Sequence, residues 1–207
     1  MLCILKGQSS RLSGWEVGFF LHFSSIACFN CQMNKMTERR EADVIAASMP
    51  SVTIYSDGSY KPMLGTGGYG SIAVCGGFCQ FFYGGYYDVS NNAMEISGAL
   101  APLRSLNLPC RVLIVSDSQY LVNGINKWVS SWHANGWKKS DGGPIQNVEL
   151  WQEMYQYMQV HLISAVWRRG HTAGNLDNTI ADQFACIGAY KEAKRDIPPH
   201  LLDIARF

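Results

Sequence analysis

The chain has 207 residues and 47% of them are hydrophobic, which predicts one domain with a sizeable core and room for an appendage. Its formal net charge is +1, which argues against a partner held by a strong overall field, although a local charged patch could still bind nucleic acid. The seven cysteines lack regular spacing, which argues against a disulfide framework and favours a reducing compartment.

Residues 1–48 differ in composition from the rest and are predicted to be a poorly structured leader. Their apolar stretch, 17–29, is too short to span a bilayer and only weakly resembles a secretory signal. We expect no membrane association and an intracellular location, the cytoplasm first. An organellar location is the alternative if the first 35 residues are a transit peptide. A third alternative is that the leader is not native protein, because methionines further along the chain offer later translation starts. Residues 36–47 are expected to form a short helix or a linker.

From Pro50 onward, turn signals separate five strand-like runs. Strands are expected at 52–56, 69–75, 78–87, 111–116 and 162–167. The Gly76-Gly77 dipeptide predicts a hairpin between the second and third strands, and residues 64–68 read as a glycine-rich loop.

Helical spacing of apolar residues predicts the elements between and after these strands. Helices are expected at 91–106, 118–126, 127–133, 147–160 and 178–194. Pro102 should kink the first of them, and Gly124 should separate the second from the third.

The order of elements predicts an α/β fold. Three antiparallel strands followed by parallel crossovers give a five-stranded mixed sheet with helices on both faces. The domain is expected to span 49–194, and residues 195–207 form a C-terminal tail of unassigned role.

Two acidic residues follow apolar strands in the predicted fold. Asp57 comes where the first strand should enter its turn, and Asp117 directly follows the run RVLIVS. Asp57 taken alone fits ordinary Asp-Gly-Ser turn chemistry. However, ligands of open α/β sheets bind at the carboxyl ends of strands, and two adjacent carboxylates there are costly without a cation.

Two further acids are expected on helices. Glu95 lies one turn into an apolar helix, where complementing the helix dipole is the simpler alternative. Asp182 lies beside apolar residues of the last helix, where an ion pair with Arg168 or Arg169 is the alternative. A cluster of carboxylates without cysteine or several histidines favours Mg²⁺ or Mn²⁺, and two such ions would suit in-line phosphoryl chemistry.

Five motifs, which follow one another in the order found in type 1 ribonuclease H, give the chain a resemblance to that family over Ser51 to about Ala193. They are YSDGSY, GTGGYG, SNNAMEI, VSDSQYLVNGI and GHTAGNLDNTIAD. The resemblance implies an endonuclease that hydrolyses the RNA strand of RNA·DNA hybrids with two metal ions, leaving a 5′-phosphate and a 3′-hydroxyl. It implies metal binding by Asp57, Glu95, Asp117 and Asp182, and proton transfer or product release assisted by His171.

The resemblance also implies a surface that binds the hybrid. Asn91, Asn92 and Gln119 match the minor-groove contacts of the family, where a 2′-hydroxyl distinguishes RNA from DNA. The segment 127–139 resembles a basic handle laid against the DNA strand, but its three lysines predict a modest electrostatic contribution. The full set of implied substrate contacts is Gly58, Ser59, Ser90, Asn91, Asn92, Gln119, Trp128, Trp132 and Lys138.

Two other functions fit the same sequence. The chain could be a hybrid-binding module with weak catalysis, or another nuclease of the same fold that acts on DNA. Helix capping by Asn91 and core packing by one or two of the tryptophans are the structural alternatives to substrate binding. A monomer is expected.

Overall fold

A computed structural model describes residues 43–170, 176–195, 197–198 and 201. The chain separates into two compact units, Met1–Val44 and Ile45–Phe207, and the sheet with its helices belongs to the second. Residues 43–48 are helical. Within the described ranges, no helix combines the length and the apolar composition needed to cross a membrane.

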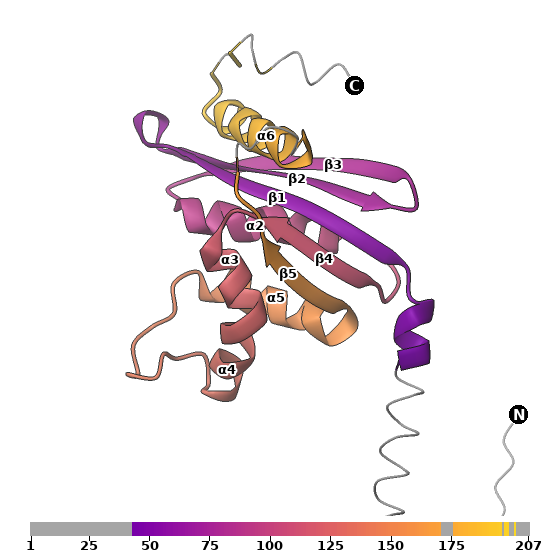
Figure 1. Cartoon of the computed structure of the whole chain (residues 1–207). Helices are drawn as coiled ribbons and strands as arrows, with labels where there is room; N and C mark the ends of the chain where they lie inside the picture. Colours follow the sequence, from indigo (N-terminus) through magenta and orange to yellow (C-terminus); the bar gives the residue numbers. More distant parts are fainter. Residues whose placement is uncertain (1–42, 171–175, 196, 199–200, 202–207) are drawn as a thin grey trace, which may run out of the picture. The chain divides into compact units, whose positions relative to one another are not determined.

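The five strands form one mixed sheet, which confirms the predicted fold class (Figure 1). The order across the sheet is β3-β2-β1-β4-β5, with antiparallel β1–β2 and β2–β3 pairs and parallel β1–β4 and β4–β5 pairs. The strands are β1 Ser51–Lys61, β2 Thr66–Cys75, β3 Phe78–Tyr87, β4 Arg111–Ser116 and β5 Leu162–Trp167.

The first strand is longer than the sequence predicts, so Asp57 lies inside β1 and not at its turn. Parallel pairing with β4 ends at Tyr55, whereas antiparallel pairing with β2 continues to Lys61 opposite Thr66. The expected loop at 64–68 is therefore wrong for 66–68, which belong to β2. The actual connection is the short 3₁₀ helix η1, Pro62–Leu64, followed by Gly65 with a left-handed φ of 64°.

The helices follow the predicted order with different ends. They are α2 Asn91–Leu103, α3 Gln119–Asn123, α4 Val129–Ala134, α5 Val148–Val160 and α6 Leu176–Glu192. Pro102 lies in the last turn of α2, and the helix ends at Leu103, short of the expected residue 106. Pro102 has no N–H to donate to the preceding turn, whereas the N–H of Arg104 still donates a 3.0 Å hydrogen bond to the carbonyl oxygen of Leu100.

Gly124 does not separate two helices as the sequence predicts. The π-helical segment η2, Gly124–Trp128, joins α3 directly to α4. A Cβ atom at Gly124 would overlap the ring of Trp151, so the glycine is needed for close packing against α5. The glycine is therefore present because of this contact, and its low helix propensity does not end the helix here.

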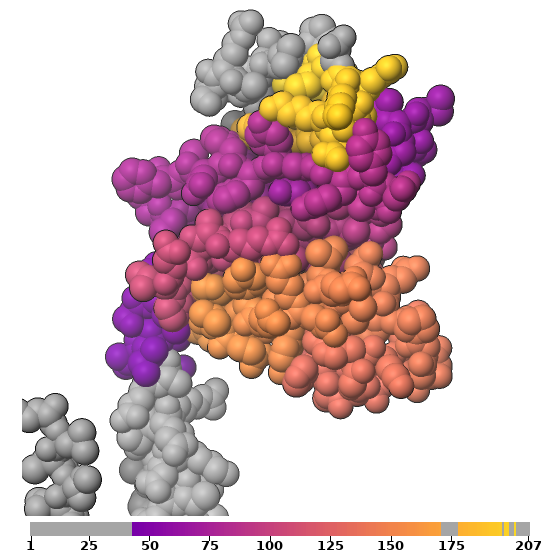
Figure 2. All heavy atoms as spheres, turned by 180° about the vertical axis from the view of Figure 1, so that it is seen from behind, coloured from indigo at the N-terminus to yellow at the C-terminus, as the bar shows by residue number. Residues whose placement is uncertain are grey.

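The helices cover the two faces of the sheet unequally (Figure 1). A large core between the sheet and the α2–α5 side contains Ile54, Ile96, Ile114, Leu121 and Trp151, each fully buried. On the other face, α6 lies over β1, β2 and β3. Figure 2 shows α6 in yellow against the purple strands, with the orange α5 on the far side of the sheet.

Part of the predicted C-terminal tail packs on α6. Leu201 is 6% exposed and clusters with Phe184 and Ile187. Ile197 packs on the same cluster, so these two described residues, whose role the sequence left unassigned, cover apolar side chains of α6.

Glycines in β2 let α6 approach the sheet closely. A Cβ atom at Gly70 would lie 2.5 Å from the backbone nitrogen of Ala185 and 2.8 Å from Cβ of Phe184, and it would overlap the carbonyl oxygen of Ala181. Gly68 meets the α6 backbone in the same way. Glycine within a strand often marks such a close backbone approach.

Replacing Gly70 by alanine should lower the free energy of unfolding by at least about 1–3 kcal/mol, because α6 would have to move away from β2. Urea denaturation followed by circular dichroism measures this change. Gly143→Ala is the control, since its new Cβ would meet only the side chain of Asp141, which is exposed. Equal stabilities of the two variants would contradict the packing argument.

Candidate active site

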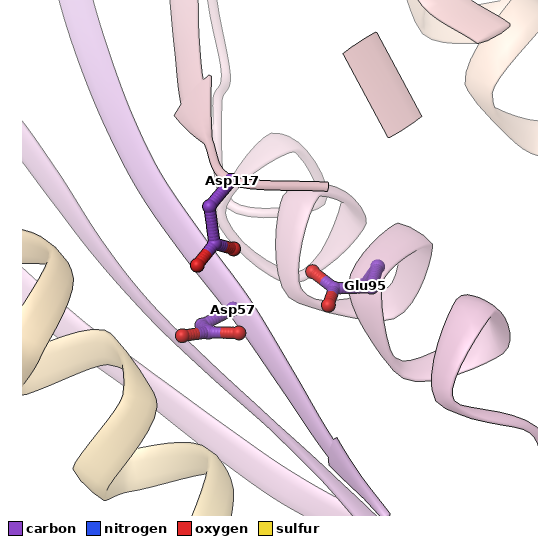
Figure 3. A group of neighbouring side chains, drawn as sticks. All are labelled: Asp57, Glu95 and Asp117. Carbon is purple, nitrogen blue, oxygen red and sulfur yellow. The ribbon is translucent and has the colours of Figure 1, made fainter. Parts of the chain in front are cut away.

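Three carboxylates from three different elements converge at one place (Figure 3). Asp57 comes from β1, Glu95 from α2, and Asp117 from the end of β4. One carboxylate oxygen of each lies within 4.8 Å of the others. Asp57 is 7% exposed and Glu95 5% exposed, so two of the three are shielded from water.

Gly58 brings Glu95 close to Asp57. A Cβ atom at Gly58 would lie only 2.6 Å from the backbone nitrogen of Glu95, so a side chain there would push the start of α2 away from β1. The backbone N–H of Gly58 also donates a 2.7 Å hydrogen bond to Oδ1 of Asp57. The predicted substrate-binding glycine therefore has a clear structural role within the acidic cluster.

The backbone at Asp117 is held by β5. The indole Nε1–H of Trp167 donates a 2.8 Å hydrogen bond to the carbonyl oxygen of Asp117. Gly170 lies against the carboxylate of Asp117, where a Cβ atom would overlap Oδ2. These contacts fix Asp117 at the point where β4 and β5 end.

Burial and mutual repulsion raise the pKa values of two carboxyl groups. The pKa of Asp57 is raised to about 8, first by burial and then by the charges of Asp117 and Asp182, against the lowering effect of the Gly58 N–H. The pKa of Glu95 is raised to about 9, first by burial and then by repulsion from Asp57 and Asp117. Three charges in this pocket are therefore unfavourable without a counter-charge.

The acidic cluster has the donor set of a hard divalent cation. All three groups offer oxygen, which Mg²⁺ and Mn²⁺ prefer. Oε2 of Glu95 is buried without a hydrogen-bond partner, while Oε1 accepts a 3.2 Å hydrogen bond from Nδ2 of Asn91. Because a buried carboxylate oxygen without a donor is costly, Oε2 is suited to ligate an ion.

The fourth predicted acid, Asp182, is not part of the 4.8 Å cluster. It lies half-buried on α6, and its charge contributes to the raised pKa of Asp57. His171 lies outside the described residues.

The predicted contacts at the starts of the helices have mixed local roles. Ser90 is the N-cap of α2, and its hydroxyl accepts a 3.1 Å hydrogen bond from the N–H of Ala93. Asn91 is not the cap and instead donates to Glu95. Gln119 is exposed at the first residue of α3, and Asn92 is partly exposed at the start of α2.

The predicted handle contains both packed and exposed residues. Trp132 packs edge-on against Trp151, with a 5.6 Å separation of ring centroids, and Trp128 lies beside Trp132 at 5.6 Å. Both also line a hollow together with Lys139. Lys138 is exposed. Core packing and a surface role therefore coexist in these tryptophans.

Sequence reasoning overlooked two residues near the site. Trp167 supports Asp117 through its indole N–H, although it is 46% exposed. Asn178 is 2% exposed on α6, four residues before Asp182, and its Oδ1 has no partner within the described protein. The signal for Asn178 was its place in the motif GHTAGNLDNTIAD, four residues before Asp182.

Comparisons with known proteins give one consistent result. The family model described as RNase H matches residues 49–190. A Ribonuclease H of Cupriavidus necator is 43% identical over 140 residues, covering 68% of this chain and 96% of the relative. A Ribonuclease H of Pseudomonas fluorescens is 39% identical over 144 residues, covering 70% and 94%.

A solved structure gives the same result. The crystal structure of LC9-RNase H1, described as a type 1 RNase H with the type 2 active-site motif, aligns with a TM-score of 0.62 and 27% identity. The alignment covers 77% of this chain and 82% of that chain.

The raised pKa values predict that stability without divalent metal falls as pH rises. The stability that each group contributes is fully present below its unfolded pKa, which is 3.8 for Asp57 and 4.5 for Glu95. It is lost as pH rises through the folded pKa, which is about 8 for Asp57 and about 9 for Glu95. Thermal unfolding with and without Mg²⁺ tests this. Mg²⁺ should raise Tm more at about pH 8.5 than at about pH 5.5, where protons compete for the same oxygens.

Asp57→Asn supplies the control for this experiment, since it removes one titrating ligand. The variant should show a weaker fall in stability with pH and a smaller Mg²⁺ effect at high pH. A Mg²⁺-induced change in Tm that is the same at both pH values would contradict metal binding by these carboxylates.

Proposed function

The chain belongs to the ribonuclease H family, whose members are metal-dependent hydrolases of RNA in RNA·DNA hybrids, and we propose that it cleaves hybrids by a two-metal mechanism. The convergence of Asp57, Glu95 and Asp117 within 4.8 Å carries this proposal. The products would be a 5′-phosphate and a 3′-hydroxyl. Water attacks phosphorus, the bond from phosphorus to the 3′-oxygen breaks, and that oxygen takes up a proton.

In this proposal two Mg²⁺ or Mn²⁺ ions are held by Asp57, Glu95, Asp117 and Asp182. When bound, such ions lower the pKa of the attacking water and stabilise charge on the leaving oxygen. Asp182 suits the outer side of the site, since it lies beyond the three-residue cluster yet close enough to raise the pKa of Asp57. His171 is proposed to assist proton transfer or product release.

The protein's own groups prepare the site for this chemistry. The N–H of Gly58 orients the carboxylate of Asp57, and the amide of Asn91 orients Oε1 of Glu95, leaving Oε2 for ligation. Preorganised ligands of this kind need little rearrangement during the reaction.

Selectivity for RNA is proposed to come from the starts of α2 and α3. Asn92 and Gln119 are at least partly exposed there, and amide groups can both donate to and accept from a 2′-hydroxyl. Asn91 is proposed to contribute as well, although its amide also serves Glu95. Trp128, Trp132 and Lys138 are proposed to contact the DNA strand, and Ser59 and Ser90 the RNA side.

We also propose that the enzyme is a monomer that acts in a reducing intracellular compartment, with the cytoplasm as the preferred location. Support comes from the four described cysteines Cys75, Cys79, Cys110 and Cys186, which are all unpaired.

Removing one charge from the acidic cluster should abolish turnover. Asp57→Asn and Asp117→Asn should each lower kcat by at least about a hundredfold, because each removes a metal-ligating charge. Cleavage of a labelled hybrid in Mg²⁺ measures the effect, and circular dichroism confirms folding. Asp88→Asn is the matched control, since Asp88 is exposed and its left-handed φ of 52° suits asparagine. Wild-type turnover in either cluster variant would remove that residue from the mechanism.

A panel of four matched duplexes tests the substrate. Only the RNA·DNA hybrid should be cut rapidly, with little cleavage of duplex RNA, duplex DNA or DNA carrying one ribonucleotide, and none without divalent metal. Equal cleavage of duplex DNA would favour a DNA nuclease of the same fold. Binding of the hybrid without metal-dependent turnover would favour a non-catalytic binding module.

A further inference from the structure

A second set of polar side chains lies next to the acidic cluster between β1 and α6. Side chains of a strand alternate between faces, so Asp57, Ser59 and Lys61 share one face of β1. On α6, Asp182 and Cys186 are four residues apart and share one side of the helix. Ser59 and Lys61 therefore follow Asp57 on the same face of β1, and Cys186 follows Asp182 one turn later on α6.

The thiol of Cys186 holds this second set together. Nζ of Lys61 lies 3.3 Å from Sγ of Cys186, and Oγ of Ser59 lies 3.4 Å from the same sulfur. Ser59 is buried, and Lys61 and Cys186 are half-buried. The ammonium group of Lys61 is therefore located beside α6 by a neutral, polarisable partner and does not extend freely into water.

The charge of Lys61 is not neutralised by a carboxylate of the described residues. The ion pair found among the described residues joins Arg104 at the end of α2 to Glu153 of α5, and no described acid lies within 4.0 Å of Lys61. A half-buried ammonium group normally requires an anionic partner or water. Its position next to a site for a polyanionic substrate suggests where that partner comes from.

The spacing along β1 suits a phosphate near the cleaved bond. At about 3.3 Å per residue, the Cα atoms of Asp57 and Lys61 are about 13 Å apart. A nucleic-acid strand carries one charge per about 3.4 Å of helix axis, so this distance corresponds to a few nucleotides.

We propose that Lys61, located by the thiol of Cys186, binds a backbone phosphate of the RNA·DNA hybrid a few nucleotides from the scissile bond. The inference rests on the proposed function and adds a substrate-binding residue to it. The neutral thiol is important, because a carboxylate at position 186 would neutralise the charge that the phosphate requires. Lysine suits this role as a point charge that needs no second hydrogen bond.

The test compares Lys61→Gln, which removes the charge, with Lys61→Arg, which keeps it. Hybrid binding is measured in EDTA, so that no cleavage occurs, over a series of salt concentrations, and kcat and KM are measured in Mg²⁺. Lys61→Gln should weaken binding roughly three- to tenfold at low salt and lower the slope of log K against log[salt] by about 0.7–0.9. It should leave kcat within about twofold, and Lys61→Arg should restore most of the affinity.

Neutral linkages locate the phosphate. A series of hybrids carries one neutral methylphosphonate each, at successive positions of the strand. Wild-type protein should bind the hybrid more weakly when a contacted phosphate is replaced, and at one of these positions Lys61→Gln should show no such loss of affinity. Cys186→Ala should show a smaller loss of affinity than Lys61→Gln, with the same charge, because it only frees the lysine. Lys191→Gln is the charge-matched control on α6, since Lys191 donates to the hydroxyl of Tyr83 and its loss should leave affinity unchanged.

The outcomes separate this inference from the proposed function. If the wild type cleaves hybrids while Lys61→Gln keeps the wild-type salt slope and the wild-type response to every methylphosphonate, Lys61 binds no phosphate and only the inference fails. If the wild type neither binds nor cleaves hybrids, the proposed function fails and this inference fails with it. A fall in kcat without a change in salt slope would also overturn the inference, since it would indicate a structural effect on the acidic cluster.

Discussion

Repulsion among carboxylates that are largely shielded from water is the constraint on which this site depends. Asp57 and Glu95 are more than nine-tenths buried, with Asp117 within 4.8 Å, so the folded chain without cations carries an electrostatic penalty. The raised pKa values of the two buried groups express that penalty. An acidic cluster that keeps this penalty in the folded state is suited to divalent cations, and the surrounding elements hold the three acids in place.

The close approach of helix backbones to the sheet makes this arrangement possible. Gly58 admits the start of α2 to β1 and so places Glu95 against Asp57, while Gly68 and Gly70 admit α6 to β2. The acids come from distant parts of the chain, so their separation depends on how closely these layers pack. Glycine here provides space and not flexibility, because any Cβ would meet backbone atoms that cannot rotate away.

Positive and negative groups around the site lie at different positions along the elements that carry them. The acids occupy one end of the β1–β4 pair, while Lys61 lies further along β1 against a neutral thiol of α6. The tryptophans of η2 and α4 pack partly into the core and partly line a hollow with Lys139. This division is consistent with a substrate that brings both phosphates and metal ions, since each type of charge meets its opposite at a different position.

Local patterns predicted the order of elements and the mixed five-stranded sheet, because apolar periodicity and turn residues are local features. Acids that follow apolar runs likewise predicted an acidic cluster. These patterns were wrong for the 66–68 segment and Gly124, because a glycine read locally is a turn or a break, and Gly58 put Asp57 at a turn for the same reason. Packing in the folded chain places Gly68 against α6 and Gly124 against Trp151, and it brings Trp167 to Asp117 and Lys61 to Cys186. Such contacts join residues distant in the chain, and their distances depend on packing between layers, which no local pattern encodes.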